Sequence, residues 1–86
     1  MLRSTAIWNA ISHGMERGRW TSVDAIYDIV LGRLKIDDED LEPQAPGQAT
    51  PKWKRNVRNV LQRRKGKGDI EWDGAGMYRL PKERSW

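Results

Sequence analysis

The 86-residue sequence contains no cysteine and only one histidine. Disulfide frameworks and zinc sites built from cysteines or paired histidines are therefore excluded. No apolar run approaches the roughly 20 residues of a membrane-spanning helix, and the N-terminus has no apolar signal-peptide segment. From these absences we expect a cytoplasmic protein with no membrane partner.

Phenylalanine is also absent, whereas tryptophan occurs five times. A chain of this length buries only about 60–65% of its unfolded surface, enough for one modest core. The large tryptophan rings are expected to supply much of the buried area. We predict a single domain spanning residues 1–86.

Acidic residues are missing from one stretch, Pro51–Gly68 (PKWKRNVRNVLQRRKGKG). It holds eight of the sixteen lysines and arginines, whereas the rest of the chain has eight basic and twelve acidic residues. Such a concentrated positive field attracts polyanions, although a charge run is more often a solvated surface. The lack of any interleaved acid favours a polyanionic partner.

Apolar spacing predicts a first helix over residues 4–17, capped by Ser4 or Thr5 and ended by Gly18. Its stripe repeats every three or four residues: Ile7, Ala10, Ile11, Gly14 and Met15. Residues 19–21, which contain Trp20, are too few for a helix and are predicted to form a short strand.

A second helix is predicted from a capping-box pattern, Thr21 followed by Asp24. Its buried stripe is expected to contain Val23, Ile26, Tyr27, Val30 and Leu34. The next segment, residues 36–50, has five acids, two prolines and no usable period, so we expect an irregular connection. One hypothesis places its acids beside the basic stretch.

A third helix is predicted over residues 51–65, with Thr50 as its cap and Pro51 at its first position. Its apolar seam contains Trp53, Val57, Val60, Leu61 and the stem of Arg64. The opposite face contains Arg55, Arg58, Asn59 and Gln62, with Lys52 and Lys54 on the shoulders. Gly66 and Gly68 end the helix.

The segment DIEWDGAGMYRL, residues 69–80, is predicted to form a β-hairpin. Pairing residue 72 with 78 and residue 70 with 80 brings four apolar side chains to one face: Ile70, Trp72, Tyr78 and Leu80. This register requires a three-residue loop, Gly74-Ala75-Gly76, and places Glu71 opposite Arg79. Pro81 ends the second strand.

The order of these elements predicts an α+β fold, a winged helix-turn-helix with three helices, a short first strand and a C-terminal β-hairpin wing. The major groove of B-DNA admits an α-helix, and arginine, asparagine and glutamine can each pair with a base edge through two hydrogen bonds. Lysine is better suited to phosphate. The predicted contacts with double-stranded DNA are Lys52, Lys54, Arg55, Arg58, Asn59, Gln62, Arg63, Lys65 and Lys67.

Two stretches, WTSVDAIYDIV and PKWKRNVRNVLQRRKGKGDIEWDGAGMYRL, resemble the winged-helix domains of restriction endonucleases. The similarity is to the Mrr N-terminal type and to the domain that accompanies N6-methyladenine-dependent restriction enzymes, and it covers roughly residues 20–80. The resemblance implies DNA contacts from Lys52 to Arg63 and a specificity module of a restriction system, with a nuclease domain attached or separate. One departure is the hairpin tip, where Asp73 argues against a wing that clamps phosphate by charge.

Reading of N6-methyladenine is a further expectation from this resemblance. The added methyl group needs an apolar wall beside a hydrogen-bond acceptor. The wall is predicted from Trp53 or from the stems of Lys52 and Arg55, and the acceptor from Asn59 or Gln62. The competing interpretation is that Trp53 belongs to the core.

An enzyme is not expected, and neither a cofactor nor a metal is predicted. Asp69 and Glu71 lack the following lysine of a restriction-type nuclease site, and residues 66–68 lack the spacing of a phosphate-binding loop. His13 is expected to be exposed or at the rim of the core. The oligomeric state and the recognised DNA sequence stay open.

Two other functions compete with this interpretation. One is the DNA-binding domain of a transcriptional regulator. The other is a winged-helix adaptor for protein partners, whose apolar patch would come from Trp8, Leu31 and Trp86. RNA binding is less favoured, since single-strand readers need exposed aromatics and most aromatics here have predicted core positions.

Overall fold

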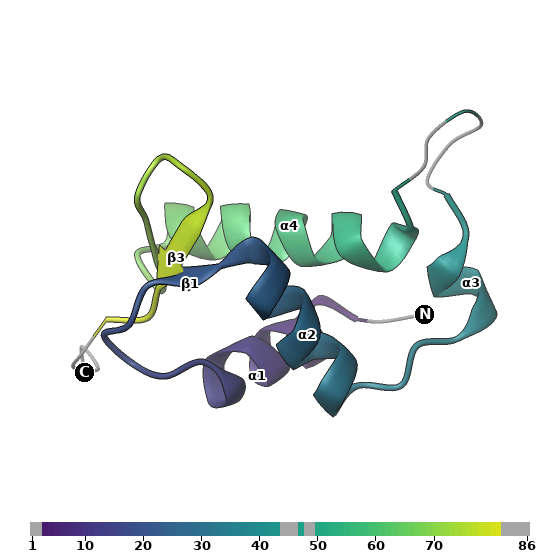
Figure 1. Ribbon diagram of the computed structural model, residues 1–86, viewed down its shortest axis with the longest axis horizontal. Coiled ribbons are helices and arrows are strands. Elements are labelled where there is room, and N and C mark those ends of the chain that lie inside the picture. Colours follow the sequence, from purple (N-terminus) through teal and green to yellow (C-terminus); the bar gives the residue numbers. More distant parts are fainter. Residues whose placement is uncertain (1–2, 44–46, 48–49, 82–86) are drawn as a thin grey trace.

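The computed structural model describes residues 3–43, 47 and 50–81. Within these residues the chain forms an α+β fold of four helices and one three-stranded antiparallel sheet (Figure 1). Its elements are α1 (Ser4–Gly14), β1 (Thr21–Ser22), α2 (Val23–Arg33), α3 (Asp38–Leu41), α4 (Lys52–Gly66), β2 (Glu71–Trp72) and β3 (Met77–Arg79). The strand order is β1-β3-β2.

The long helix α4 lies along one side of the molecule, and α1 and α2 lie on the opposite side of the molecule (Figure 1). The sheet stands beside the C-terminal end of α4. One core joins these parts, and its largest fully buried apolar side chains are Ile7, Ile11, Ile26, Leu61, Ile70 and Leu80. Of the helices in the described residues, none is long and apolar enough to cross a membrane.

Helix α1 is shorter than predicted, ending at Gly14 instead of residue 17. Met15 leaves the helix in an extended conformation and buries its side chain, and the Gly18 N–H then binds the Leu80 carbonyl at 2.8 Å. The helix ends early because the chain must reach the sheet. The predicted Ser4 or Thr5 cap is also wrong, since Arg3 occupies the cap position and makes no side-chain bond there.

Gly14 permits the close approach of α1 and α2. A Cβ atom at this position would lie 2.3 Å from Ile29 Cγ2, which is closer than real Cβ contacts allow. Gly14 therefore fits in the stripe predicted for α1 because it has no side chain that would meet α2.

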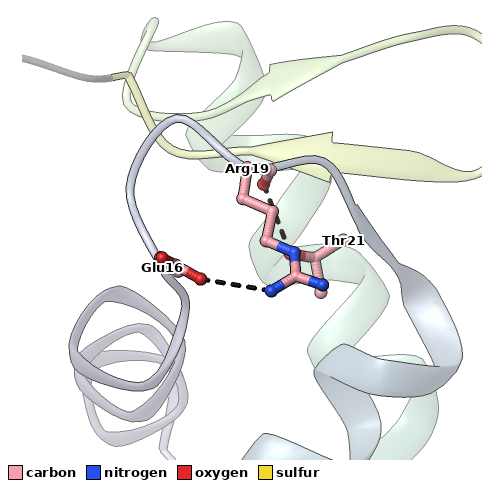
Figure 2. Close-up of polar contacts among 3 residues, drawn as sticks. All are labelled: Glu16, Arg19 and Thr21. Atoms are coloured by element: carbon pink, nitrogen blue, oxygen red, sulfur yellow. Dashed lines mark hydrogen bonds and ion pairs between the residues drawn. The ribbon is translucent and has the colours of Figure 1, made fainter.

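The connection from α1 to β1 is a turn with polar contacts of its own (Figure 2). Arg19 Nη1 donates to Glu16 Oε2 at 3.3 Å, and the Thr21 hydroxyl donates to the Arg19 carbonyl at 3.3 Å. Both charged side chains are largely exposed, so their ion pair adds little stability. The strand begins after this turn, at Thr21, instead of at residue 19 as predicted.

The N-cap of helix α2 lies one residue later than predicted. Ser22, not Thr21, is the N-cap, and its hydroxyl accepts the Ala25 N–H at 3.1 Å. Thr21 is committed to β1, where it pairs with Tyr78. Of the predicted stripe, Ile26 and Val30 are fully buried, and the rest packs against the core partly buried: Val23, Tyr27 and Leu34.

The acidic connection contains a helix that the sequence analysis missed, so the predicted number of helices is wrong. Asp37 caps α3 by accepting the Asp40 N–H at 3.0 Å, and Asp40 returns the bond by accepting the Asp37 N–H at 3.3 Å. The acid spacing Asp37-x-x-Asp40 was the available signal for this capping box. Residues 44–46 and 48–49 of the predicted connection lie outside the described residues.

Helix α4 has the predicted buried seam: Trp53, Val57, Val60 and Leu61. Its cap differs, because Pro51 occupies the N-cap position and Thr50 lies one residue before it. The predicted helix range is shifted by one residue at each end.

The hairpin has the predicted register, with Trp72 opposite Tyr78 and Glu71 opposite Arg79. The predicted core position of Trp72 is wrong, since this residue is 43% exposed while Ile70 is buried. Trp72 shares the face of Ile70 but lies on the edge strand β2, whereas its partner Tyr78 lies on the central strand β3 and is buried. The Trp72 ring instead stacks on Tyr78.

Candidate nucleic-acid interface

The exposed face of α4 brings together the side chains predicted to read bases. Arg55, Arg58, Asn59 and Gln62 are all exposed and lie across the helix from the buried seam. Together with Thr50 they line an open hollow of about 270 Å³. Arginine, asparagine and glutamine side chains can each make two hydrogen bonds to a base edge, so the hollow offers several alternative pairings.

Several cations of α4 have no acidic partner among the residues that the structure describes. They are Arg55, Arg58, Arg63 and the cap residue Lys67. All four are exposed. Since no carboxylate balances them, they can meet phosphates without first losing an ion pair.

Three other cations of the basic segment lie over aromatic rings from three different elements. Lys54 Nζ is 5.2 Å from the ring centroid of Tyr27 in α2, and Lys65 Nζ is 4.3 Å from that of Trp72 in β2. Arg64 Cζ is 4.9 Å from that of Trp8 in α1. Cation–π contacts of this kind are worth about 0.5–1 kcal/mol each at exposed sites. They offset part of the repulsion among like charges on one helix.

Two residues of the basic segment are ion-paired at the ends of α4. Lys52 Nζ lies 3.8 Å from Glu42 Oε2, and the Lys52 N–H also donates to the Glu42 carbonyl at 2.8 Å. The Arg64 guanidinium lies 3.1 Å from Asp69 Oδ2. The hypothesis that acids of the connection lie beside the basic stretch therefore holds at Glu42, and a phosphate at Lys52 would compete with that pair.

Gln62 is held by the hairpin in a way that the sequence did not indicate. Its Nε2 donates to the Tyr78 hydroxyl at 3.2 Å, and Tyr78 is only 4% exposed. The two residues are sixteen positions apart, and their contact depends on how the hairpin packs against α4. No local pattern could have predicted it.

Tyr27 lies at the junction of α2 and α4, where its ring meets Trp53 edge-on with centroids 5.5 Å apart. Burial raises the pKa of the Tyr27 hydroxyl, against an opposing effect of the Arg58 guanidinium. A tyrosine hydroxyl is already protonated at neutral pH, and the raised pKa moves its ionisation further from that range.

Trp53, proposed as a wall for a methylated base, is 3% exposed and packed against Tyr27. Its ring belongs to the core seam, in agreement with the competing interpretation. The alternative wall, the stem of Arg55, lies on the exposed face beside the hollow.

The acid at the hairpin tip has a structural task. Asp73 Oδ1 accepts the N–H groups of Ala75 at 2.7 Å and Met77 at 3.0 Å. Gly74 and Gly76 take the positive φ values, 84° and 91°, that the predicted loop requires. The tip thus has no basic group, and its carboxylate already accepts two hydrogen bonds from the turn.

The residues weighed for other functions are dispersed. Asp69 and Glu71 each pair with an arginine, Arg64 and Arg79 respectively. Of the residues proposed for the apolar patch of an adaptor, Leu31 is 47% exposed and Trp8 is partly buried beneath Arg64, while Trp86 lies outside the described residues. His13 is exposed, with Nδ1 2.7 Å from the Asn9 carbonyl.

Comparisons of this chain with models of protein families, with curated proteins and with solved structures find no match. The proposal of a function therefore depends on the chemistry of the α4 surface.

Proposed function

We propose that this chain is a double-stranded DNA-binding module that inserts α4 into the major groove. The single observation that carries the proposal is the exposed cluster of Arg55, Arg58, Asn59 and Gln62 around one hollow. These side chains offer the donors and acceptors that base edges match. Arg63 and Lys67, which follow the cluster and have no acidic partner among the described residues, suit the flanking phosphates.

The proposed arrangement is a winged helix in which α2 and α4 form the helix-turn-helix and β2–β3 the wing. The order α1, β1, α2, α4, β2, β3 supports it, with α3 as an added helix in the connection between α2 and α4. The proposed setting is the specificity module of a restriction system, with a nuclease domain attached or supplied by a partner. This setting depends on the likeness of residues 20–80 to such domains.

Two substitutions test which face contacts DNA. Arg55→Ala and Asn59→Ala should each weaken binding to a preferred duplex by about 1–3 kcal/mol, because each removes a base contact. Stability should be almost unchanged, since both side chains are exposed. Fluorescence anisotropy with duplexes selected from a random-sequence pool measures the first effect, and urea unfolding the second.

Lys35→Ala provides the matched control, since it removes an exposed cation from the segment between α2 and α3, on the side of the molecule away from α4 (Figure 1). Its affinity should equal that of the parent. Equal losses in Arg55→Ala and Lys35→Ala, with no loss in Asn59→Ala, would indicate that only net charge matters, and unchanged affinity in both α4 variants would refute the proposed interface.

The module is also proposed to discriminate N6-methyladenine from adenine. Since the remaining N6 hydrogen pairs with thymine, the Arg55 stem would contact the methyl group and the side-chain amide of Asn59 or Gln62 would donate to adenine N7. One methyl contact is worth about 1 kcal/mol, so the methylated duplex should bind roughly five- to tenfold more tightly. Competition between methylated and unmethylated duplexes of the same sequence measures the ratio, and equal affinity in every adenine context would leave DNA binding without methyl sensing.

A further inference from the structure

Two side chains of α4 are held by aromatic residues of the hairpin. Gln62 donates to the Tyr78 hydroxyl at 3.2 Å, and Lys65 Nζ lies 4.3 Å from the Trp72 ring centroid. The two aromatics are cross-strand partners whose rings stack, with centroids 6.4 Å apart and planes 22° apart. We call this connected set the hairpin junction: Gln62, Lys65, Trp72 and Tyr78.

The hairpin junction combines a buried residue, Tyr78, with two side chains of α4. Tyr78 lies on β3, the central strand, and is buried, so its hydroxyl is a fixed anchor. Gln62 and Lys65 are three residues apart and therefore neighbours on the helix surface. Long polar side chains lose rotamer freedom when they bind a partner, and an anchored side chain has lost part of it in advance.

The anchored Gln62 amide keeps the groups that a base requires. An amide nitrogen carries two hydrogens, and Tyr78 takes one of them. The second hydrogen and the amide oxygen are the donor and acceptor that adenine pairs with at N7 and N6. Tyr78 therefore holds the amide through one N–H and leaves its other N–H and its oxygen for a base.

The tip of the hairpin offers no comparable group. Residues 73–76 contain no basic residue, and the Asp73 carboxylate accepts hydrogen bonds from two N–H groups of the turn. The contribution of the hairpin to a polyanion interface thus lies at the junction, where it meets α4.

We propose that the hairpin acts as a positioning element for DNA recognition: Tyr78 orients Gln62 toward a base, and Trp72 holds Lys65 toward a phosphate. The proposal rests on the function proposed above, with α4 in the major groove. Tyr78 and Trp72 are positioning residues, and neither needs to touch DNA.

Tyr78→Phe tests the first contact, because it removes the hydroxyl and keeps the ring in the core. One net hydrogen bond corresponds to about a fivefold loss of affinity for a duplex selected by the parent. A duplex in which the adenine read by Gln62 is replaced should bind parent and variant alike. In a Gln62→Ala background, Tyr78→Phe should have no further effect.

Trp72→Leu tests the second contact. Loss of an exposed cation–π contact should lower affinity about threefold for any duplex, whatever its sequence. In a Lys65→Ala background, Trp72→Leu should change nothing, whereas Lys65→Ala alone should reduce the salt slope by about 0.9. Trp20→Leu is the matched control, since Trp20 is similarly exposed but lies beneath Arg79.

A measurement on the free parent requires no substitution. The Gln62 side-chain amide should have a higher NMR order parameter than the Asn59 amide, although glutamine has one more rotatable bond. An order parameter equal to or below that of Asn59 would overturn the anchoring by Tyr78.

The outcomes separate the two proposals. A parent that does not bind duplex DNA overturns the proposed function. A parent that binds with strong salt dependence, but in which Tyr78→Phe adds its full effect to Gln62→Ala and Trp72→Leu adds its full effect to Lys65→Ala, overturns only the positioning element.

Discussion

Affinity for duplex DNA is expected to fall about a thousandfold when salt rises from about 50 to about 200 mM. The basic segment can reach about five or six phosphates, and each neutralised phosphate contributes about −0.9 to the slope of log K against log salt, for a total near −5. The cations available for these contacts are Lys54, Arg63, Lys65 and Lys67, with Lys52 once its pair with Glu42 opens. Anisotropy titrations of one duplex at several salt concentrations measure the slope.

Removal of the two flanking cations provides the comparison. Arg63→Ala combined with Lys67→Ala should reduce the slope by about 2, because two phosphate contacts are lost. Lys35→Ala should leave it unchanged. A slope near zero for the parent would contradict binding in the groove, and an adaptor for protein partners would bind DNA weakly at every salt concentration.

Trp53→Ala is expected to destabilise the protein by about 3–5 kcal/mol, the usual cost of deleting a buried tryptophan ring. Trp53 is 3% exposed in the first turn of α4, with its ring edge-on to Tyr27 of α2. The edge-on pair adds about 0.5–1.5 kcal/mol to the area that the ring buries. Urea unfolding should show a lower midpoint with an unchanged m-value.

Trp72→Ala is the matched control for this loss, since its ring is 43% exposed on the hairpin. It should cost about 1 kcal/mol or less. If Trp53→Ala unfolded like the parent and lost only DNA affinity, the ring would contact DNA as the proposed methyl wall, and its placement in the core would be wrong.

Patterns within single elements were sufficient to predict which face of α4 is buried and which is exposed. Trp53, Val57, Val60 and Leu61 recur at helical spacing, and this period alone places the polar residues on the opposite face. The same holds for the hairpin, where alternation and the glycine-containing turn predict the pairing of Trp72 with Tyr78. Both predictions depend on periodicity, which neighbouring residues in the chain determine.

The ends of elements were less predictable because they depend on distant partners. Helix α1 ends at Gly14 because the following chain turns to bond with Leu80, and Thr21 joins β1 because β3 lies beside it. Helix α3 was missed although its capping acids were present, since the absence of an apolar period outweighed the short Asp37-x-x-Asp40 signal.

The sequence by itself determined that one helix would carry an apolar seam, an opposite face of arginine, asparagine and glutamine side chains, and an excess of positive charge. Only the tertiary structure decided which of those charges are free, paired or stacked: Lys52 meets Glu42, Lys65 meets Trp72, and Arg58 has no acidic partner among the described residues. It also decided that Gln62 is anchored to Tyr78. The physical reason is that helical period depends on residues three or four apart, whereas ion pairs and ring contacts require packing between elements that lie far apart in the chain.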